Sequence, residues 1–451
     1  MYKKIPNILL VNPWIYDFAA YDLWSKPLGL LLLAGFLRDF GYNLRLLDCL
    51  DVHDSRMKEI AGVKPATRRA FGAGKFYRME VEKPAALANI DRTYYRFGIT
   101  PEIFQERLLQ GAEPDVILMT STMTYWYPGV QETTRLLKAH FPRVPIVLGG
   151  IYATLCREHA ARHSGADHVI SGPAESRILE FVEKLTGHRS HRATRAKKPQ
   201  TLPWPAYDLM NHLDYVCVLT SRGCPYHCPY CASDLLYPDF VRRNPNQVVN
   251  ELEHWYQLFE VVDVAFYDDA LLVDAGNHLL PMLAEIRARD LPLRFHTPNG
   301  MHLSVLSAAV CQALHDSCFK TVRLGLETAD PGRQQKMGGK VKSRDFSAAM
   351  DNLTRAGFSP DQIGVYLLCG LPGQDPAEVS RSIRVVQDHG ARPHLAEYSP
   401  IPGTRFWPEA LRCSPYDIAG EPLFHNNSLL SCQSERFGFE ELQRLKQLCR
   451  E

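Results

Sequence analysis

Between residues 215 and 400 the sequence alternates short apolar runs with amphipathic helical patterns. The apolar runs, rich in β-branched and aromatic residues, predict strands at 215–221, 262–269, 293–300, 321–328, 363–370 and 394–400. The helical patterns lie at about 246–259, 277–289, 303–315, 344–356 and 376–389. Strands joined by helices pair in parallel, because a parallel neighbour needs a long crossover connection. Six strands are fewer than the eight of a closed barrel, so this half predicts an open, partial (β/α)6 barrel.

The first half of the chain shows a similar alternation. Apolar runs without strict polar alternation predict strands at 7–12, 43–48, 115–121, 145–150 and 168–171. Helical patterns lie at 28–40 and at about 128–140, 153–163 and 174–186. Such strands are buried on both faces by helices. The predicted fold class is therefore α/β, with an N-terminal doubly wound, Rossmann-like parallel sheet before the barrel.

These patterns divide the chain into a first domain at 1–187, a linker at 188–212, the barrel at 213–409 and a C-terminal tail at 410–451. Residues 49–110 interrupt the first domain, and their many aromatic residues predict an ordered insertion. The linker begins HRSHRATRAKKPQ, with five Lys/Arg in 13 residues and no interleaved aromatics. This composition is typical of a solvated tether and gives no clear nucleic-acid site. The tail could cover the mouth of the barrel.

Composition excludes several other classes of protein. The formal net charge of +1 gives no overall field that would recruit nucleic acid or anionic membrane. The longest apolar run, LGLLLLAGFL at 28–37, has about half the length of a membrane span. The N-terminus does not resemble a signal peptide, so we expect a soluble, cytoplasmic protein with no membrane span. Most of the 12 cysteines should then be reduced thiols.

Three cysteines stand apart from this background, in the stretch SRGCPYHCPYCAS that follows the first predicted barrel strand. Cys224, Cys228 and Cys231 lie within eight residues, a spacing that indicates a metal site or a redox pair. Structural zinc prefers four ligands, and the chain has no second CxxC, although His227 inside the loop is a possible fourth. Iron–sulfur clusters also take cysteine ligands, and three thiolates on a four-iron cluster leave one iron open for a reacting ligand.

Polar residues follow the other predicted barrel strands. In parallel β/α barrels the reactive groups come from the C-terminal ends of the strands, so these residues should surround the cysteine loop. They are Asp268 and Asp269 after the second strand, Glu327 after the fourth and Ser399 after the sixth, and the glycine-containing segment that begins at Gly370 follows the fifth. Loops begin at strand ends and are often polar, which explains one or two such residues but explains a whole ring of them less easily.

The CxxxCxxC spacing at the end of a barrel's first strand, with Tyr230 just before the last cysteine, resembles the radical S-adenosylmethionine (radical SAM) signature. The resemblance implies that Cys224, Cys228 and Cys231 hold a [4Fe–4S] cluster. The open iron of that cluster chelates S-adenosylmethionine, and an electron from the cluster cleaves the sulfonium to a 5′-deoxyadenosyl radical. It also implies a reducing electron donor of the flavodoxin or ferredoxin type.

Further site residues follow from the same resemblance. Tyr230 should pack near the adenine of S-adenosylmethionine, and Asp268 or Asp269 should meet its methionine amino group. Glu327 matches a position facing the ribose or the methionine, and Gly370 begins a glycine motif along the adenine. The pair Asp268-Asp269 departs from the common Gly-Gly-Glu form, so which aspartate binds stays open.

The first half resembles the cobalamin (B12)-binding domain that precedes many radical SAM barrels, in the stretches ILLVNPW, KPLGLLLLAGFLRDFGYNLRLLD, PDVILMTSTMT, PIVLGGIYATL and GADHVISGPAE. Doubly wound sheets bind ligands beyond the C-terminal ends of their strands. The candidate cobalamin-binding residues at these ends are Asn12, Ser121, Thr122, Gly149, Gly150 and Gly172. The Asp-x-His-x-x-Gly loop of many cobalamin proteins is missing, since Asp51-Val52-His53 continues with Asp54, Ser55 and Arg56. Cobalt should therefore lack a protein imidazole.

Together these features predict a cobalamin-dependent radical SAM enzyme that methylates an unactivated carbon of an unknown substrate. One alternative is a radical SAM enzyme of another reaction type, such as rearrangement or cyclisation, with a vestigial cobalamin domain. Another is a non-catalytic iron–sulfur sensor, which the polar residues around the barrel mouth disfavour.

Overall fold

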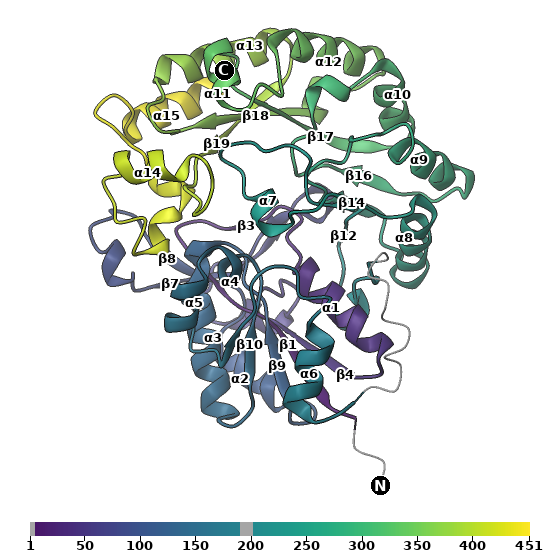
Figure 1. Ribbon diagram of the computed structural model, residues 1–451, viewed down its shortest axis with the longest axis vertical. Coiled ribbons are helices and arrows are strands. Elements are labelled where there is room, and N and C mark those ends of the chain that lie inside the picture. Colours follow the sequence, from purple (N-terminus) through teal and green to yellow (C-terminus); the bar gives the residue numbers. More distant parts are fainter. Residues whose placement is uncertain (1–4, 190–201) are drawn as a thin grey trace. The chain divides into compact units, whose positions relative to one another are not determined.

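The computed structural model describes residues 5–189 and 202–451. The chain divides into two compact units, Met1–Asp214 and Tyr215–Glu451 (Figure 1). Of the predicted linker, residues 190–201 lie outside the described residues. Residues 202–214 pack within the first unit, where the Ala206 N–H donates to the Leu31 carbonyl at 2.9 Å. The described end of the predicted linker is therefore part of the first unit.

The first unit is built on a parallel sheet with the strand order β11-β10-β9-β1-β4. Its strands are β1 (Asn7–Asn12), β4 (Asn43–Asp48), β9 (Val116–Met119), β10 (Ile146–Leu148) and β11 (His168–Val169). Its helices are α1 (Leu28–Asp39), α2 (Pro101–Leu109), η4 (Thr124–Trp126), α3 (Tyr127–His140), α4 (Ile151–Leu155), α5 (Arg157–His163), α6 (Ile178–Thr186) and η5 (Tyr207–Leu209).

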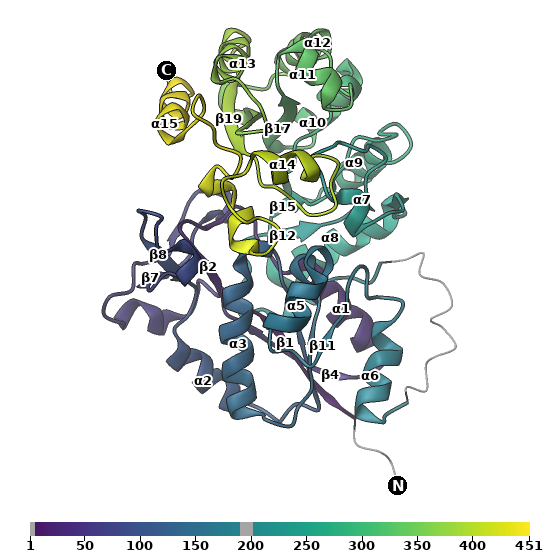
Figure 2. The same ribbon diagram turned by 60° about the vertical axis from the view of Figure 1, so that its left-hand side comes forward.

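Helices cover both faces of this sheet. Residues of β1 and β9 form one core with α1 and α6, and Figure 2 shows α3 on the opposite side. The strand order reverses direction between β1 and β9, which is the switch point where such sheets bind ligands. The predicted doubly wound fold is confirmed, with β9, β10 and β11 shorter than their apolar runs.

The segment 49–110 is ordered and forms two small antiparallel sheets with residues that follow β1. The sheet β2-β8-β7 joins β2 (Ile15–Asp17), β8 (Tyr94–Phe97) and β7 (Arg78–Val81). The sheet β3-β6-β5 joins β3 (Tyr21–Asp22), β6 (Gly74–Lys75) and β5 (Thr67–Arg68). The segment also contains three short 3₁₀ helices, η1 (Ser55–Glu59), η2 (Ala70–Gly72) and η3 (Ala85–Leu87).

The second unit is an open parallel sheet in which the strands follow one another in chain order, β12-β15-β16-β17-β18-β19. They are β12 (Val216–Val218), β15 (Asp263–Phe266), β16 (Arg294–His296), β17 (Phe319–Glu327), β18 (Ile363–Cys369) and β19 (Arg392–Glu397). Along the outside run α8 (Pro245–Phe259), α9 (Leu279–Ala288), α10 (Ala308–Asp316), α12 (Ser343–Arg355) and α13 (Pro376–Asp388) (Figure 1). The predicted partial barrel is confirmed.

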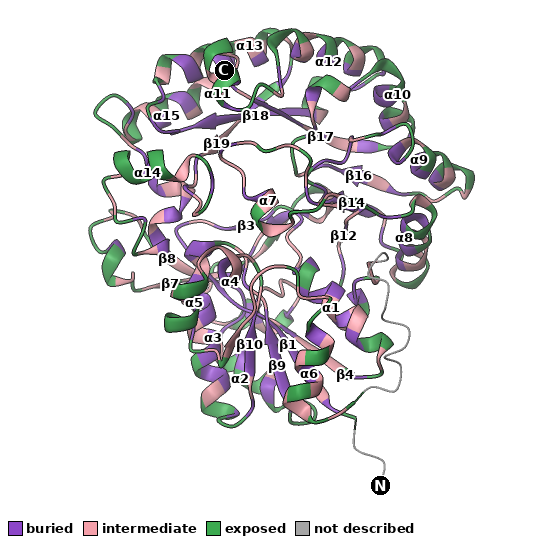
Figure 3. Cartoon of the chain, in the orientation of Figure 1, coloured by how far each residue is buried: buried purple, intermediate pink, exposed green. Residues whose placement is uncertain are grey.

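Shorter elements lie between and after these strands. They are the ribbon β13 (Ser221–Arg222) with β14 (Val241–Arg242), and α7 (Ser233–Leu236), η6 (Leu303–Val305), α11 (Pro331–Lys336), η7 (Pro360–Gln362), α14 (Trp407–Cys413), η8 (Pro422–His425), η9 (Asn427–Leu429) and α15 (Phe439–Leu448). The C-terminal α15 packs against α13 (Figure 2). Figure 3 shows the strands as the buried layer of this unit and the outer faces of its helices as exposed.

The helices are short in the part of the chain that the structure describes. The 15-residue α8 is the longest of them. None of these helices combines the length and the apolar character needed to cross a membrane.

Candidate active site

The three clustered cysteines lie in one loop of the second unit, between β13 and α7. We call residues 223–232 the cysteine loop. The chain enters it through Gly223, whose φ of +74° is a conformation that glycine adopts without strain. A Cβ at Gly223 would lie 2.5 Å from the Asp239 carbonyl oxygen, so no other residue fits this turn. The backbone N–H of Cys231 donates to the Cys228 carbonyl at 3.1 Å and closes the far end of the loop.

All three thiols are half-buried, and burial shapes their chemistry. Burial raises the pKa of Cys224 to about 11 and also raises the pKa of Cys231. The Cys231 sulfur and the Ser233 hydroxyl lie 3.1 Å apart. Binding to a positively charged metal centre offsets the burial and converts such thiols to thiolates.

The spacing of the thiols fits a cluster better than a single zinc ion. Zinc–sulfur bonds of about 2.3 Å in a tetrahedron place neighbouring sulfurs about 3.8 Å apart. Among the described residues, the three thiols do not form a group whose ligand atoms all lie within 4.8 Å of one another, so at least one of the three sulfur–sulfur distances exceeds that of a zinc tetrahedron. His227, considered as a fourth ligand, is exposed and its Nδ1 lies 3.4 Å from the Asp234 carboxylate. Three thiolates and an open position therefore suit a four-iron cluster.

Asp268 is fixed by the backbone just before the cysteine loop. Its carboxylate accepts hydrogen bonds from the N–H groups of Thr220 and Ser221 at 3.0 Å and 2.6 Å. It also accepts from their hydroxyls at 2.7 Å and 2.6 Å. The buried His278 lies 3.0 Å from the Thr220 hydroxyl and extends the network. Asp268 therefore holds the strand end in place, and its oxygens are occupied within the protein.

Asp269 is differently situated, although it is the next residue. Its side chain is open to solvent, yet the surrounding protein raises the pKa of its carboxyl group. The Ser233 hydroxyl hydrogen-bonds to it and lowers that pKa in part. Ser233 also contacts Cys231, so Asp269 is linked to the cysteine loop through one side chain. Of the two aspartates, Asp269 is the one available to a ligand beside the thiols.

Glu327, at the end of β17, faces the same loop. Its φ of +67° is unusual for a residue other than glycine. Burial raises the pKa of its carboxyl group, and a hydrogen bond joins it to the Tyr230 hydroxyl. Burial also raises the pKa of Tyr230, and the charge of Glu327 adds to this. Two residues predicted from the resemblance are thus in direct contact.

Lys340 completes this group, and the sequence reasoning missed it. Its Nζ lies 3.7 Å from the Glu327 carboxylate. Burial would lower the pKa of Lys340, but the neighbouring Glu327 and Cys228 raise it above the usual value. Lys340 follows Gly338-Gly339, both at positive φ, in the segment between α11 and α12. A paired glycine before a lysine was the one signal in the sequence that could have found it.

A second missed residue is His302, which follows β16. Its ring stacks on Tyr226 of the cysteine loop, with centroids 4.5 Å apart and planes 24° apart. Its Nδ1 lies 2.9 Å from the Ser304 hydroxyl, and burial lowers its pKa to about 4. A neutral imidazole therefore supports one wall of the loop.

The remaining candidates of the barrel differ from one another. Gly370, at φ +76°, turns the chain after β18 in a conformation that favours glycine, and a Cβ there would lie 2.5 Å from the Leu430 side chain. Ser399 donates its hydroxyl to the His425 carbonyl at 2.5 Å and so fastens the C-terminal segment. The structure brings Tyr230, Asp269 and Glu327 to the thiols and uses Asp268 and Ser399 within the protein.

The candidates of the first unit also fall into two groups. Asn12 donates to Asp48 at 2.8 Å, and the Ser121 hydroxyl donates to the Gly149 carbonyl at 2.6 Å. These two side chains are buried and stabilise the strand ends. Gly150 has φ +96°, and a Cβ there would lie 2.1 Å from the Ser121 carbonyl oxygen.

Gly149, Thr122 and Gly172 leave more room. A Cβ at Gly149 would meet only the Ile170 carbonyl at 3.9 Å, and at Gly172 nothing within 4 Å. Thr122 follows β9 in the sequence and is half-buried. Open space over glycines that follow β10 and β11, on the β9 side of the switch point, fits a large planar ligand such as a corrin. His53 lies instead beyond β4, where its Nε2 is 3.0 Å from the Asp214 carboxylate.

Two family models match the chain. The model of the radical SAM superfamily matches residues 218–386, which include the cysteine loop and β15 to β18. The model of the B12 binding domain matches residues 85–182, which include β9 to β11. The resemblance carried by the cysteine spacing and by the first-half stretches is confirmed.

Known proteins resemble the chain over most of its length. The uncharacterized methyltransferase PH0819 of Pyrococcus horikoshii is 22% identical over 335 residues, which cover 68% of this chain and 71% of that protein. The uncharacterized methyltransferase sll1242 of Synechocystis is 28% identical over 325 residues, covering 70% of this chain and 57% of that protein. The solved radical SAM methyltransferase TsrM of Kitasatospora setae superposes with a TM-score of 0.64 at 15% identity, covering 96% and 84% of the two chains. At that identity the structural likeness shows a shared fold.

Proposed function

The chain is a radical SAM enzyme with a B12-binding domain before its barrel, and from this premise we propose that it transfers a methyl group to an unactivated carbon. The observation that carries the proposal is the pairing of an open three-thiol loop with an open switch point in a B12-binding sheet. The two relatives named as methyltransferases support it. The substrate class is left to experiment.

The cofactors follow from the two domains. A radical SAM domain implies a [4Fe–4S] cluster and S-adenosylmethionine, and a B12-binding domain implies cobalamin. When bound, the cluster supplies an electron to S-adenosylmethionine and cobalamin carries a methyl group. Cys224, Cys228 and Cys231 would hold the cluster. Each thiol is close enough to the others to feel their charge.

The residues around the loop would position S-adenosylmethionine. Asp269 would accept a hydrogen bond from the methionine amino group, since its carboxylate is accessible beside Cys231 and Asp268 is occupied. Glu327 and Tyr230 would line the next part of the ligand, and Gly370 would let the adenine approach the backbone. The ammonium of Lys340 would balance the negative charge of the thiolates and of Glu327.

The first unit would hold cobalamin over Thr122, Gly149, Gly150 and Gly172. Asn12 and Ser121 would act indirectly, by fixing the strand ends that form the floor of the site. We expect no imidazole on the lower cobalt face, because His53 pairs with Asp214 beyond the neighbouring strand β4. Nitrogen hyperfine structure from a histidine on cobalt would contradict this assignment.

The partners and the compartment belong to the same proposal. Radical SAM chemistry needs a reductant, and a flavodoxin or ferredoxin in the cytoplasm is the expected source. The cysteines of the chain are free thiols, which is typical of proteins from a reducing compartment.

The ratio of products tests the reaction class. Each methylation should consume two molecules of S-adenosylmethionine and form S-adenosylhomocysteine and 5′-deoxyadenosine in about equal amounts, because methyl donor and radical must meet at one carbon. Cobalamin-loaded protein that turns over substrate to 5′-deoxyadenosine without S-adenosylhomocysteine would contradict methyl transfer. It would favour rearrangement or cyclisation with a vestigial cobalamin domain. Protein that holds iron but never cleaves S-adenosylmethionine would favour a sensor.

A further inference from the structure

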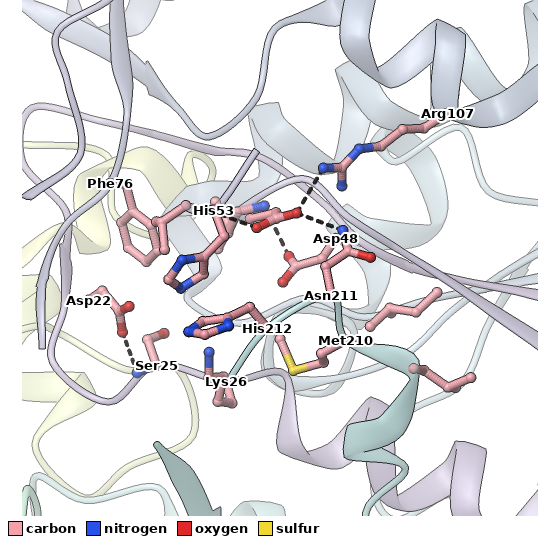
Figure 4. A pocket seen from close by; sticks show the side chains of 15 residues that line it. Asp22, Ser25, Lys26, Asp48, His53, Phe76, Arg107, Met210, Asn211 and His212 are labelled. Atoms are coloured by element: carbon pink, nitrogen blue, oxygen red, sulfur yellow. Dashed lines mark hydrogen bonds and ion pairs between the residues drawn. The ribbon is translucent and has the colours of Figure 1, made fainter. Parts of the chain in front are cut away.

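Two histidines of the first unit, His53 and His212, line a small pocket beyond the end of β4 (Figure 4), and the Asp214 carboxylate lies against both. The Nε2 atom of His53 lies 3.0 Å from one carboxylate oxygen of Asp214, and Nε2 of His212 lies 3.4 Å from the other. The two imidazole rings have centroids 4.2 Å apart. One ligand atom from each of the three residues lies within 4.8 Å of the others.

The loops that carry these ligands are held together by Asp51. Its carboxylate accepts the backbone N–H of His53 at 2.8 Å and the side-chain amide of Asn211 at 2.9 Å. Arg107 donates to the same carboxylate at 2.7 Å. Since Asn211 is the neighbour of His212, one buried acid fixes both histidine-bearing loops. The three ligands are therefore positioned before any ion binds.

We propose that His53, His212 and Asp214 bind a divalent transition-metal ion of the Zn²⁺ class. Metal–nitrogen and metal–oxygen bonds of about 2.1 Å place neighbouring ligand atoms about 3.0 Å apart at right angles and about 3.4 Å apart in a tetrahedron. The two nitrogen–oxygen distances in the structure are 3.0 Å and 3.4 Å. With two imidazoles and one carboxylate bound, the ion would keep further coordination positions for water or a small ligand. The pocket volume of about 30 Å³ accommodates an ion with a water.

A simple ion pair explains this arrangement less well. One protonated histidine is enough to neutralise Asp214, whereas two imidazolium rings at 4.2 Å would repel each other. Two neutral rings can each donate an Nε2–H to one oxygen of Asp214, and a metal ion would take the place of these two protons among the same three groups.

The nearby cations already have carboxylate neighbours. Arg68 lies 3.9 Å from Asp214 but pairs with Asp22 at 2.6 Å. Burial raises the pKa of Asp48, and the charge of Lys26, which lines the pocket, opposes that rise in part. Arg107 pairs with Asp51 and also with Asp54, each at 2.7 Å. Arg68 therefore pairs more closely with Asp22 than with Asp214.

Zinc uptake by the full-length protein with its cluster assembled tests the proposal. The test variant is His212→Ala, which removes the exposed ligand. The control variant is His315→Ala, because His315 is also exposed and lies 3.8 Å from a carboxylate. After incubation with Zn²⁺ and gel filtration, mass spectrometry of the metal should find about one more zinc per chain in the wild type and in His315→Ala than in His212→Ala. Zn²⁺ should also raise the melting temperature of the first two proteins by a few degrees and leave that of His212→Ala unchanged.

Acid provides an independent readout. The extra zinc should be lost as the solution is made acidic, because an imidazole must be neutral to bind a metal. Equal zinc in all three proteins would overturn the proposal and leave an ion pair. An equal loss in both variants would also overturn it, by showing non-specific uptake. Zinc is a sufficient probe, because a site of this type that holds Fe²⁺ holds Zn²⁺ more tightly.

Discussion

The carboxylate of Asp268 accepts two hydrogen bonds from Ser221, one from its backbone N–H and one from its hydroxyl, each at 2.6 Å. The two residues are 47 positions apart, and Ser221 begins the ribbon that leads into the cysteine loop. This contact separates the roles of two adjacent aspartates that the sequence alone could not distinguish.

Exchanging each aspartate for asparagine should therefore give different results. Asp268→Asn places amide hydrogens against buried donors and should lower the free energy of unfolding by about 1–3 kcal/mol. Asp269→Asn should leave stability within about 0.5 kcal/mol, because its side chain is exposed. It should instead weaken S-adenosylmethionine binding, measured by equilibrium dialysis. Equal ligand affinity in Asp269→Asn and wild type would remove Asp269 from the proposed site.

Replacing Cys224, Cys228 and Cys231 together by alanine should abolish cluster assembly. Wild-type protein purified without oxygen should contain about four irons and four sulfides, and the triple variant almost none. The control is Cys318→Ala, an exposed cysteine outside the loop, which should keep the full cluster. Iron retained by the triple variant would locate the cluster elsewhere.

Lys340→Met tests the cation beside the loop. The variant keeps the length of the side chain but removes the charge that faces Glu327 and Cys228. Loss of a charged hydrogen bond worth about 1.5–3 kcal/mol corresponds to a roughly 10- to 100-fold slower cleavage of S-adenosylmethionine. Iron content should stay at the wild-type value. Lys336→Met, an exposed lysine in α11, is the control and should show wild-type rates.

Gly149→Val tests the first unit. Because a Cβ at this position meets only one atom at 3.9 Å, the unit should fold with little loss of stability. The added methyl groups should occupy the space above the strand end, and the visible absorbance of retained cobalamin should fall. Gly150→Ala should instead destabilise the folded unit itself, since its Cβ would lie 2.1 Å from a backbone oxygen. Full cobalamin retention by Gly149→Val would place the corrin elsewhere.

His425 should make stability depend on pH. Burial lowers its pKa to about 4, so the folded protein holds a neutral ring while the unfolded chain binds a proton near pH 6.5. Its stabilising effect is complete above pH 6.5 and is lost as the pH falls toward 4. Between pH 6.5 and 5 the loss should be about 1.6 kcal/mol. Urea unfolding at both pH values should show a smaller loss in His425→Gln than in wild type. An equal loss in both proteins would contradict this pKa.

The strands were predictable from the sequence, and the partners of their end residues were not. Apolar runs identify β17 and β18 because strands buried on both faces need continuous apolar side chains. The cysteine spacing identifies its loop because the ligands are close in sequence. Lys340 and His302 escaped prediction because their places depend on how separate loops approach in three dimensions. Ser399 was selected for its position at a strand end, but the structure pairs it with a segment 26 residues further along.

The positive φ of Glu327 has a consequence for engineering of this chain. A non-glycine residue in the left-handed region gives up about 1 kcal/mol of stability, and glycine would recover it. Glycine would also remove a buried carboxylate beside Tyr230 and Lys340. Glycine would leave the ammonium of Lys340 without its carboxylate neighbour, and this loss would offset the torsional gain. Exchanging Glu327 for glycine is therefore a poor route to a more stable chain, although the torsion alone invites it.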